Sequence, residues 1–219
     1  PISLLYGIAV FVRNRFFDIG ICKSHTFDFP VISVGNLSVG GTGKSPHIEY
    51  LIRLLQDNFK IAILSRGYKR KSRNFVVASD SVKWQDIGDE PMQFFNKFNN
   101  NNVIIAVDEK RKRGIKNLMN KFSDLSIILL DDAFQHRHVK SGLSILLTDY
   151  YSPYYNDFLL PSGKLREPAV EAKRADIIVV TKCPRVLSPI TIKTIEEKIK
   201  PAPHQELFFS DRKSTRLNS

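Results

Sequence analysis

Cysteine is scarce in this 219-residue sequence, which has only Cys22 and Cys183. The two lie far apart and neither belongs to a paired spacing, so a disulfide framework or zinc ribbon is disfavoured and a reducing compartment is expected. Long apolar runs are also missing, because the strongest, residues 2–12, is about half of the ~20 residues that cross a bilayer. The sequence contains no internal repeat. A hydrophobic content of 42% nevertheless gives one large domain a core to bury.

Acidic residues are too few to balance the basic ones, since 22 Asp and Glu against 33 Lys and Arg give a formal net charge of +11. Basic residues cluster at 69–73, at 110–113 and in the C-terminal tail, which indicates an anionic partner or surface. No recognition helix, zinc module or aromatic-basic motif accompanies them, so we expect no nucleic-acid partner. Anionic lipid headgroups and a phosphorylated substrate explain the charge equally well, and a solvated basic face is the alternative for any one cluster.

The first segment favours a lipid surface. Residues 2–12 are strongly apolar, and Arg13 and Arg15 follow them. We interpret residues 1–28 as an interfacial, membrane-docking helix with its arginines toward headgroups, followed by a linker. A core helix is the alternative, because a helix that is apolar on several faces is also at home inside a protein. A cleaved signal is disfavoured, because the basic residues follow the apolar run and no small-residue cleavage site is evident.

Both ends of the sequence suggest an incomplete chain. There is no initiator methionine, and the strand-like residues 207–209 give way at once to a polar segment without periodicity. We predict that residues 211–219 are a non-native tail. The main domain is then expected to span residues 29–210.

Short apolar, β-branched runs alternate with helical patterns along most of this domain. The helical patterns include residues 48–55, 91–98 and 111–121. Such alternation predicts an α/β fold, a mostly parallel sheet with helices on both faces. Ligands of such sheets bind beyond the carboxyl ends of the strands. The predicted strands are residues 31–34, 61–64, 103–107, 127–130, 143–147 and 177–180.

A glycine-rich segment, residues 35–46, follows the first predicted strand and precedes a helical pattern. This setting is typical of a phosphate-binding loop, in which backbone N–H groups and a helix N-terminus attract an anion, and it predicts a P-loop NTPase-like fold. We expect Lys44 to neutralise the outer phosphates and the Ser45 hydroxyl to bind Mg²⁺. The usual pattern has glycine at position 38, and the double glycine supplies the backbone freedom instead. The predicted phosphate-binding residues are Ser38, Val39, Gly40, Gly41, Thr42, Gly43, Lys44 and Ser45.

Three further segments carry side chains suited to nucleotide chemistry. Asp131 and Asp132 end a predicted buried strand and could hold Mg²⁺, although an aspartate in this place is often only a cap. Asp89 lies between a polar loop and a helix, where a helix N-cap is the alternative function. Arg166 falls in a loop rich in turn-forming residues and could grip a phosphate, with an ordinary surface loop as the alternative.

Taken in order and spacing, five segments resemble the tetraacyldisaccharide 4′-kinase family, which phosphorylates a lipid A precursor. The resemblance covers residues 1 to 210 and implies transfer of phosphate from ATP to the 4′-hydroxyl of a tetraacylated glucosamine disaccharide 1-phosphate. It also implies a peripheral location on the cytoplasmic face of the bacterial inner membrane. We infer no obligate protein partner from the sequence. The five segments are residues 35–46, 64–68, 88–91, 131–136 and 160–168.

The resemblance also implies residue roles. It assigns the loop from Ser38 to Ser45 to ATP and Mg²⁺, Asp131 and Asp132 to the metal, and Asp89 to the catalytic base. Ala133 stands where glycine is common in the family, and the family continues beyond the end of this chain to a histidine that supports the base. Catalytic machinery could therefore be incomplete here. The remaining residues implied to line the active site are Gln135, His136, Arg166 and Glu167.

A P-loop GTPase, or an ATPase of the partitioning or metallochaperone type, is the alternative interpretation, because such proteins use a similar loop. Residues 179–184 superficially suggest the Thr-Lys-x-Asp signature that recognises guanine. Pro184 occupies the aspartate position, however, so the carboxylate that would bind guanine is missing. A nucleic-acid-binding ATPase rests on charge alone.

Overall fold

The computed structural model describes residues 2–98 and 100–211. Its centre is an eight-stranded sheet in the order β3-β4-β2-β5-β1-β6-β7-β8, in which the short edge strand β3 alone is antiparallel. The α/β class, with a mostly parallel sheet, is therefore confirmed. The strands are β1 Val31–Asn36, β2 Ile61–Ser65, β3 Val76–Val77, β4 Val103–Val107, β5 Ile127–Asp131, β6 Leu143–Asp149, β7 Ile177–Cys183 and β8 Glu206–Asp211.

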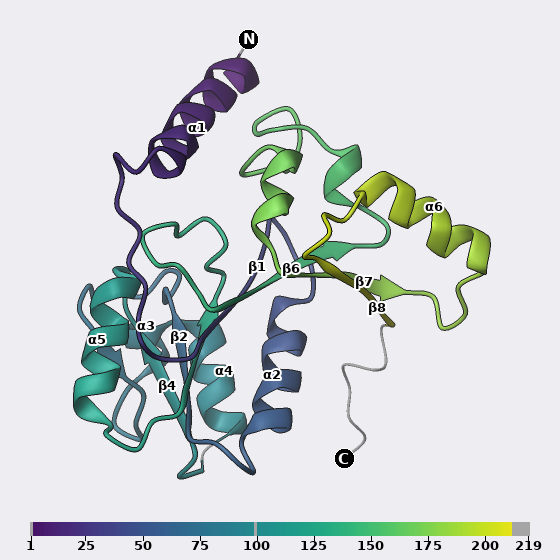
Figure 1. Cartoon of the computed structure of the whole chain (residues 1–219). Helices are drawn as coiled ribbons and strands as arrows, with labels where there is room; N and C mark the ends of the chain where they lie inside the picture. The colour runs from purple at the N-terminus through teal and green to yellow at the C-terminus, as the bar shows by residue number, and fades with distance from the viewer. Residues whose placement is uncertain (1, 99, 212–219) are drawn as a thin grey trace.

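Helices cover both faces of this sheet, as Figure 1 shows. Ala62 and Leu64 of β2 belong to the core cluster that contains α5, whereas Ile61 and Ile63 belong to the cluster that contains α2 and α4. Alternate side chains of one strand thus meet different helical layers, which is why the buried strands are mostly apolar. The helices are α1 Ile2–Asp18, α2 Lys44–Leu55, α3 Trp84–Ile87, α4 Asp89–Lys97, α5 Arg111–Lys121 and α6 Pro189–Ile199, with 3-10 turns η1 Tyr154–Asn156 and η2 Ala169–Arg174.

Strand β1 lies between β5 and β6, so the glycine-rich loop emerges at the middle of the sheet. Val34 pairs with Asp131, so the loop and the carboxylates leave the sheet at the same edge. Gly35 is needed where the two segments approach, because a Cβ there would lie 2.7 Å from the Cβ of Phe134. The carboxyl edge of the sheet thus brings together segments about a hundred residues apart.

Helix α1 stands apart from both helical layers, beside loops at one end of the sheet (Figure 1). Only Val10 and Asn14 of this helix are buried. Its outward face is apolar, with Leu5 67% and Phe11 63% exposed. In the part of the chain that the structure describes, no helix combines the length and hydropathy needed to cross a membrane.

The C-terminal strand β8 ends at Asp211, which the sequence analysis assigned to the tail. The rest of that predicted tail, residues 212–219, lies outside the described residues.

Candidate active site

The glycine-rich loop runs from the end of β1 into α2. Gly40 and Gly43 have φ of 109° and 85°, a left-handed conformation that side-chain-bearing residues rarely adopt. Thr181 of β7 donates a hydrogen bond from Oγ1 to the carbonyl of Thr42 at 2.9 Å. The loop is therefore fixed to the neighbouring strand while its helix end stays directed at the carboxyl edge of the sheet.

Lys44, the first residue of α2, points back to the strand ends. Its Nζ donates to Asn36 Oδ1 at 3.3 Å and lies 3.7 Å from Asp132 Oδ1. Asn36 in turn donates from Nδ2 to the carbonyl of Ser38 at 2.7 Å. Asn36 thus joins the start of the loop to its lysine, which places the ammonium group where phosphates bound to the loop would lie.

Helix α4 brings two carboxylates to the same edge. Gly88 precedes it with a φ of 95°, and the helix begins at Asp89. The Ser45 hydroxyl donates a hydrogen bond to the Glu90 carboxylate. Asp89 is exposed, and no described residue forms a hydrogen bond or ion pair with its carboxylate.

Asp131 is buried at the end of β5. Ser65 of β2 donates to its Oδ2 at 2.9 Å, and its Oδ1 has no hydrogen-bond partner among the described residues. Burial, reinforced by the negative charge of Glu90, raises the pKa of Asp131 to about 7, although the Ser65 hydrogen bond opposes the shift. A carboxylate in this environment needs a cation or a proton.

Asp132 follows with a φ of 47° and forms a two-pronged ion pair with Arg166. The Arg166 Nη1 and Nη2 atoms lie 3.0 Å and 2.8 Å from the two carboxylate oxygens. Burial opposes ionisation of Asp132, but Arg166, together with Lys44, outweighs it and holds its pKa below the ordinary value. Two adjacent aspartates therefore differ in protonation tendency, because Asp131 is buried beside the Glu90 charge whereas Asp132 has a guanidinium partner.

These groups line one cavity of about 390 Å³ at the carboxyl edge. A polyphosphate could be bound by its cations, and a divalent metal by its oxygens. Within the described residues no cluster of three or more His, Cys, Asp or Glu could hold a metal alone. Mg²⁺ in nucleotide sites needs only one or two carboxylates besides phosphate and water, so the unpartnered Asp131 oxygen and the Ser45 hydroxyl fit it. The charged residues that line the cavity are Lys44, Arg66, Asp89, Glu90, Asp131, Asp132 and Arg166.

A glycine-rich loop beside paired carboxylates at the carboxyl edge of the sheet agrees with the comparisons to known proteins. The family model described as tetraacyldisaccharide-1-P 4′-kinase matches residues 1–217. The chain belongs to the tetraacyldisaccharide 4′-kinase family. Family membership, rather than the loop alone, decides against the GTPase or partitioning-type alternative.

Two curated family members illustrate the similarity. The tetraacyldisaccharide 4′-kinase of Bacteroides thetaiotaomicron is 52% identical over 211 residues, which cover 96% of this chain and 55% of the relative. That of Flavobacterium johnsoniae is 52% identical over 210 residues, covering 96% of this chain and 61% of the relative. The chain thus spans a little more than half the length of the curated relatives it matches.

A solved structure in the family has the same fold. LpxK from Aquifex aeolicus, crystallised in complex with ATP, superposes with a TM-score of 0.75 at 31% identity. The match covers 96% of this chain and 79% of that chain. The fold class predicted from the sequence is therefore shared by a family member whose crystal contained nucleotide.

Four residues expected from the family resemblance lie in different surroundings. Arg166 lines the 390 Å³ cavity, but His136 lines a separate cavity of about 540 Å³, whose lining also includes Phe17 and Ser24. Gln135 donates from Nε2 to the carbonyl of Asn36 at 2.9 Å, so it reaches the site through the backbone of β1. Glu167 is wholly buried between two arginines. Only Arg166 of these four thus lines the cavity.

Burial is also the main influence on His136. Together with the positive charges of Arg111 and Arg66, it lowers the pKa of the imidazole to about 4. His136 is therefore neutral near pH 7, so one ring nitrogen can donate a hydrogen bond and the other can accept one.

Several residues of the site carry no recognisable signal of their own in the sequence. The sequence analysis includes Ser65 and Glu90 only as parts of longer segments and Asn36 only as a member of the loop, and it predicts no function for any of them. Arg111 belongs to the basic cluster at 110–113 in the sequence, yet it is buried and donates to the carbonyl of Asp131 at 3.2 Å. Each of them acts through a partner distant in sequence, which spacing along one chain cannot reveal.

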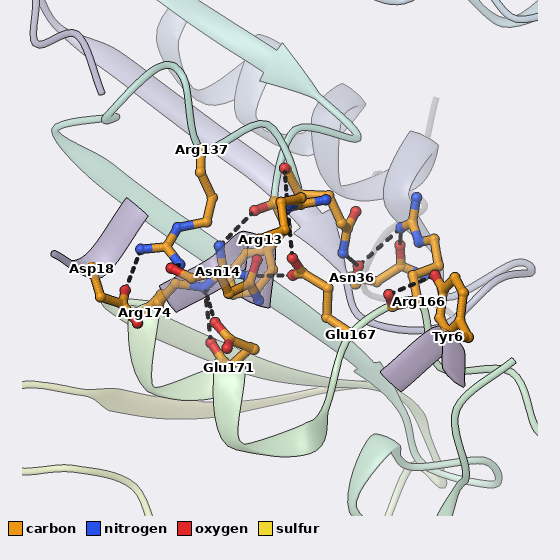
Figure 2. A network of polar contacts seen from close by, with 12 residues as sticks. Tyr6, Arg13, Asn14, Asp18, Asn36, Arg137, Arg166, Glu167, Glu171 and Arg174 are labelled. Atoms are coloured by element: carbon orange, nitrogen blue, oxygen red, sulfur yellow. Dashed lines mark hydrogen bonds and ion pairs between the residues drawn. The ribbon is translucent and has the colours of Figure 1, made fainter. Parts of the chain in front are cut away.

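The expectation that both arginines of α1 face lipid headgroups was wrong for Arg13. Its Nη2 donates to Glu167 Oε1 at 2.9 Å and to the carbonyl of Gln135 at 3.0 Å (Figure 2). Arg15 is exposed and its side chain contacts no described partner. Arg13, whose side chain is 42% exposed, is therefore held by contacts within the protein, whereas Arg15 remains for a surface.

Proposed function

We propose that this chain is the nucleotide-binding part of an enzyme that transfers the γ-phosphate of ATP to the 4′-hydroxyl of a tetraacylated glucosamine disaccharide 1-phosphate. The observation that best supports this proposal is that, in a member of this family, one cavity is lined by Lys44, Asp89, Asp131, Asp132 and Arg166. Phosphoryl transfer needs positioning and charge neutralisation more than covalent chemistry, and these groups can supply both.

The loop and the strand-end carboxylates would divide the binding of ATP and Mg²⁺ between them. Backbone N–H groups from Ser38 to Ser45 would hold the phosphates, while Lys44 neutralises charge on the outer ones. Ser45, Asp131 and Asp132 would hold Mg²⁺, which supplies further charge neutralisation when bound. The Ser45 hydroxyl would then exchange Glu90 for the cation, and Asp131 would release its proton.

Asp89 is our candidate for the catalytic base. A sugar hydroxyl is a poor nucleophile and must lose its proton as its bond to phosphorus forms. Asp89 lines the cavity without a cation or donor among the described residues that would compete for its carboxylate. Arg166, which like Lys44 contacts Asp132 Oδ1 and Asn36 Oδ1, would contact phosphate or hold Asp132 in place. Gln135, His136 and Glu167 would support the site without lining the cavity.

The proposed reaction is tested by phosphate transfer in the protein at the full length of its relatives. Radiolabel from [γ-³²P]ATP should appear on the tetraacylated disaccharide in wild type and not in Lys44→Ala. An acceptor whose 4′-hydroxyl is blocked is the matched control. Label on the blocked acceptor, or equal labelling by the Lys44 variant, would contradict the proposed reaction.

We also propose that α1 docks peripherally on the cytoplasmic face of the inner membrane, where the acylated substrate would be met. The exposed apolar residues Ile2, Leu4, Leu5, Ile8 and Phe11 support this placement. The basic cluster at 110–113 contributes less than expected, because Arg111 is buried and Arg113 is paired with Asp108 at 2.8 Å.

A further inference from the structure

The loop that carries Arg166 is held from two sides. The Arg166 backbone N–H donates to the carbonyl of Leu37 at 2.8 Å, and its carbonyl accepts a hydrogen bond from the Tyr6 hydroxyl at 2.8 Å. The first contact belongs to the segment after β1 and the second to α1. The direction in which the Arg166 side chain leaves the loop therefore depends on where α1 lies.

The next residue along the loop, Glu167, forms a stronger contact with the same helix. Its side chain is 0% exposed, and its carboxylate is paired with Arg13 of α1 at 2.9 Å and with Arg174 of η2 (Figure 2). A buried carboxylate is tolerated only when it is paired and hydrogen-bonded. Glu167 thus requires α1 to be seated, because one of its two cations comes from that helix.

A second connection runs from Arg13 to the strand end. Arg13 Nη2 also donates to the carbonyl of Gln135, whose Nε2 donates to the carbonyl of Asn36 at 2.9 Å. Arg166 Nη2 donates to this same Asn36 carbonyl at 2.9 Å. Arg166 therefore contacts Asn36 directly, and Arg13 is linked to it through Gln135. Asn36 also contacts Lys44.

The face of α1 opposite these contacts is the exposed apolar one, with Leu4 69% and Ile8 52% exposed. A single helix thus offers one side to solvent or lipid and the other to the loop of Arg166. From this arrangement we infer that Arg13 and Tyr6 are positioning residues, through which the seating of α1 holds Arg166 against Asp132. This inference rests on the proposed kinase function, and it makes α1 part of the catalytic apparatus as well as a docking helix.

The test compares Arg13→Met with Arg15→Met in the protein at the full length of its relatives. Both variants remove one charge from the same helix, but Arg15 has no described side-chain partner. Turnover should fall about tenfold in Arg13→Met, because a small displacement of charged groups in a transfer site has effects of this order or larger. The KM for ATP should rise, because Arg166 and its partner Asp132 line the cavity, whereas binding to phosphatidylethanolamine–phosphatidylglycerol vesicles should change little. The melting temperature should fall, because Glu167 loses one of its two cations. With the acceptor dispersed in detergent micelles, where docking on a bilayer plays no part, Arg15→Met should keep wild-type turnover.

Two further variants exclude a merely structural effect. Tyr6→Phe removes only the hydroxyl that bonds the Arg166 carbonyl, so turnover should fall about threefold with an unchanged melting temperature. In Arg13→Met/Glu167→Gln the uncompensated buried charge is gone, and the loss should be smaller than the product of the two single losses. Turnover within twofold of wild type in both Arg13→Met and Tyr6→Phe, or equal losses in Arg13→Met and Arg15→Met, would overturn the inference.

The failure of the proposed function is distinguishable from the failure of this inference. A wild-type protein that transfers no phosphate to the disaccharide sinks the function. The coupling is then tested by the affinity for a fluorescent ATP analogue with Mg²⁺. That affinity should fall in Arg13→Met and not in Arg15→Met if the helix positions Arg166, and equal affinities in the two variants would overturn the inference.

Discussion

Lys44 has a role that belongs to its charge rather than to the fold. Its ammonium group lies between Asn36 and Asp132, and the loop turns into α2 through glycine conformations that do not involve its side chain. We therefore expect Lys44→Ala to fold normally and to lose at least about 10²-fold in kcat. Circular dichroism and the transfer assay measure the two properties. Lys60→Ala, which removes a lysine paired with Asp124 at the other end of β2, is the control and should retain activity.

Asp89 and the paired aspartates are expected to fail in different ways. Asp89→Ala should reduce phosphate transfer far more than ATP binding, since its carboxylate is assigned to the acceptor. Asp131→Ala and Asp132→Ala should instead shift the Mg²⁺ dependence to higher concentrations. Titration of ATP affinity and of metal requirement separates the three variants. Loss of nucleotide affinity in Asp89→Ala, with normal turnover at saturating ATP, would show that the base is another residue.

Much of the cavity could be predicted at this scale because single residues carried a strong local signal. Gly40, Gly43 and Lys44 follow from the backbone requirements of a phosphate-binding turn. Glu90 and Arg111 could not be predicted, because a glutamate in a first helical turn and an arginine in a basic run are ordinary surface features. Their importance arises from burial and from partners on other strands.

At the scale of elements, buried strands were predictable and short edge elements were not. Each run that becomes β1, β2, β4, β5, β6 or β7 is predominantly apolar because helices cover both of its faces. The two-residue strand β3 and the four-residue helix α3 have no such periodicity. The sequence predicted α1 as a helix. It did not predict the ion pair between Arg13 and Glu167, because Glu167 lies in a loop about 150 residues later.

The outward side of α1 provides a test of membrane docking that leaves the inner contacts intact. Ile2→Ser and Leu5→Ser replace exposed apolar side chains and should weaken vesicle binding by up to about 1.5–3 kcal/mol each, without lowering the melting temperature. Binding should also rise with anionic lipid and fall with salt. Leu54→Ser, an equally exposed site on α2, is the control for co-sedimentation. Unchanged binding in the α1 variants would show that this face does not meet lipid.

At the scale of the whole molecule, the sheet concentrates buried charge at one edge. The cavity, the Glu167 pair and His136 all lie beyond the carboxyl ends of β1 and β5, while the apolar clusters occupy the layers behind. In such a fold the apolar layers supply most of the stability, whereas the buried charges at the edge of the sheet lower it. Its net stability should therefore respond to pH through a few buried groups.

Asp131 dominates this response in the metal-free protein. Its pKa is raised from 3.8 to about 7 in the folded state, so the folded protein holds a proton that the unfolded chain releases between these values. Stability should therefore fall as pH rises through this window, by at most about 4 kcal/mol. The lowered pKa of His136 acts in the opposite direction between about 4 and 6.5, because the unfolded chain then binds the extra proton.

A difference between variants isolates the aspartate from the histidine. Urea unfolding with EDTA, from pH 5 to pH 8, should show Asp131→Asn gaining stability over wild type as pH rises toward about 7 and a constant gain above it, since His136 is common to both proteins. Asp57→Asn, an exposed substitution, should show no such trend. Adding Mg²⁺ and ATP should remove the wild-type loss, because the cation replaces the proton on the buried carboxylate. A pH-independent difference between Asp131→Asn and wild type would mean that Asp131 is not protonated in the folded protein.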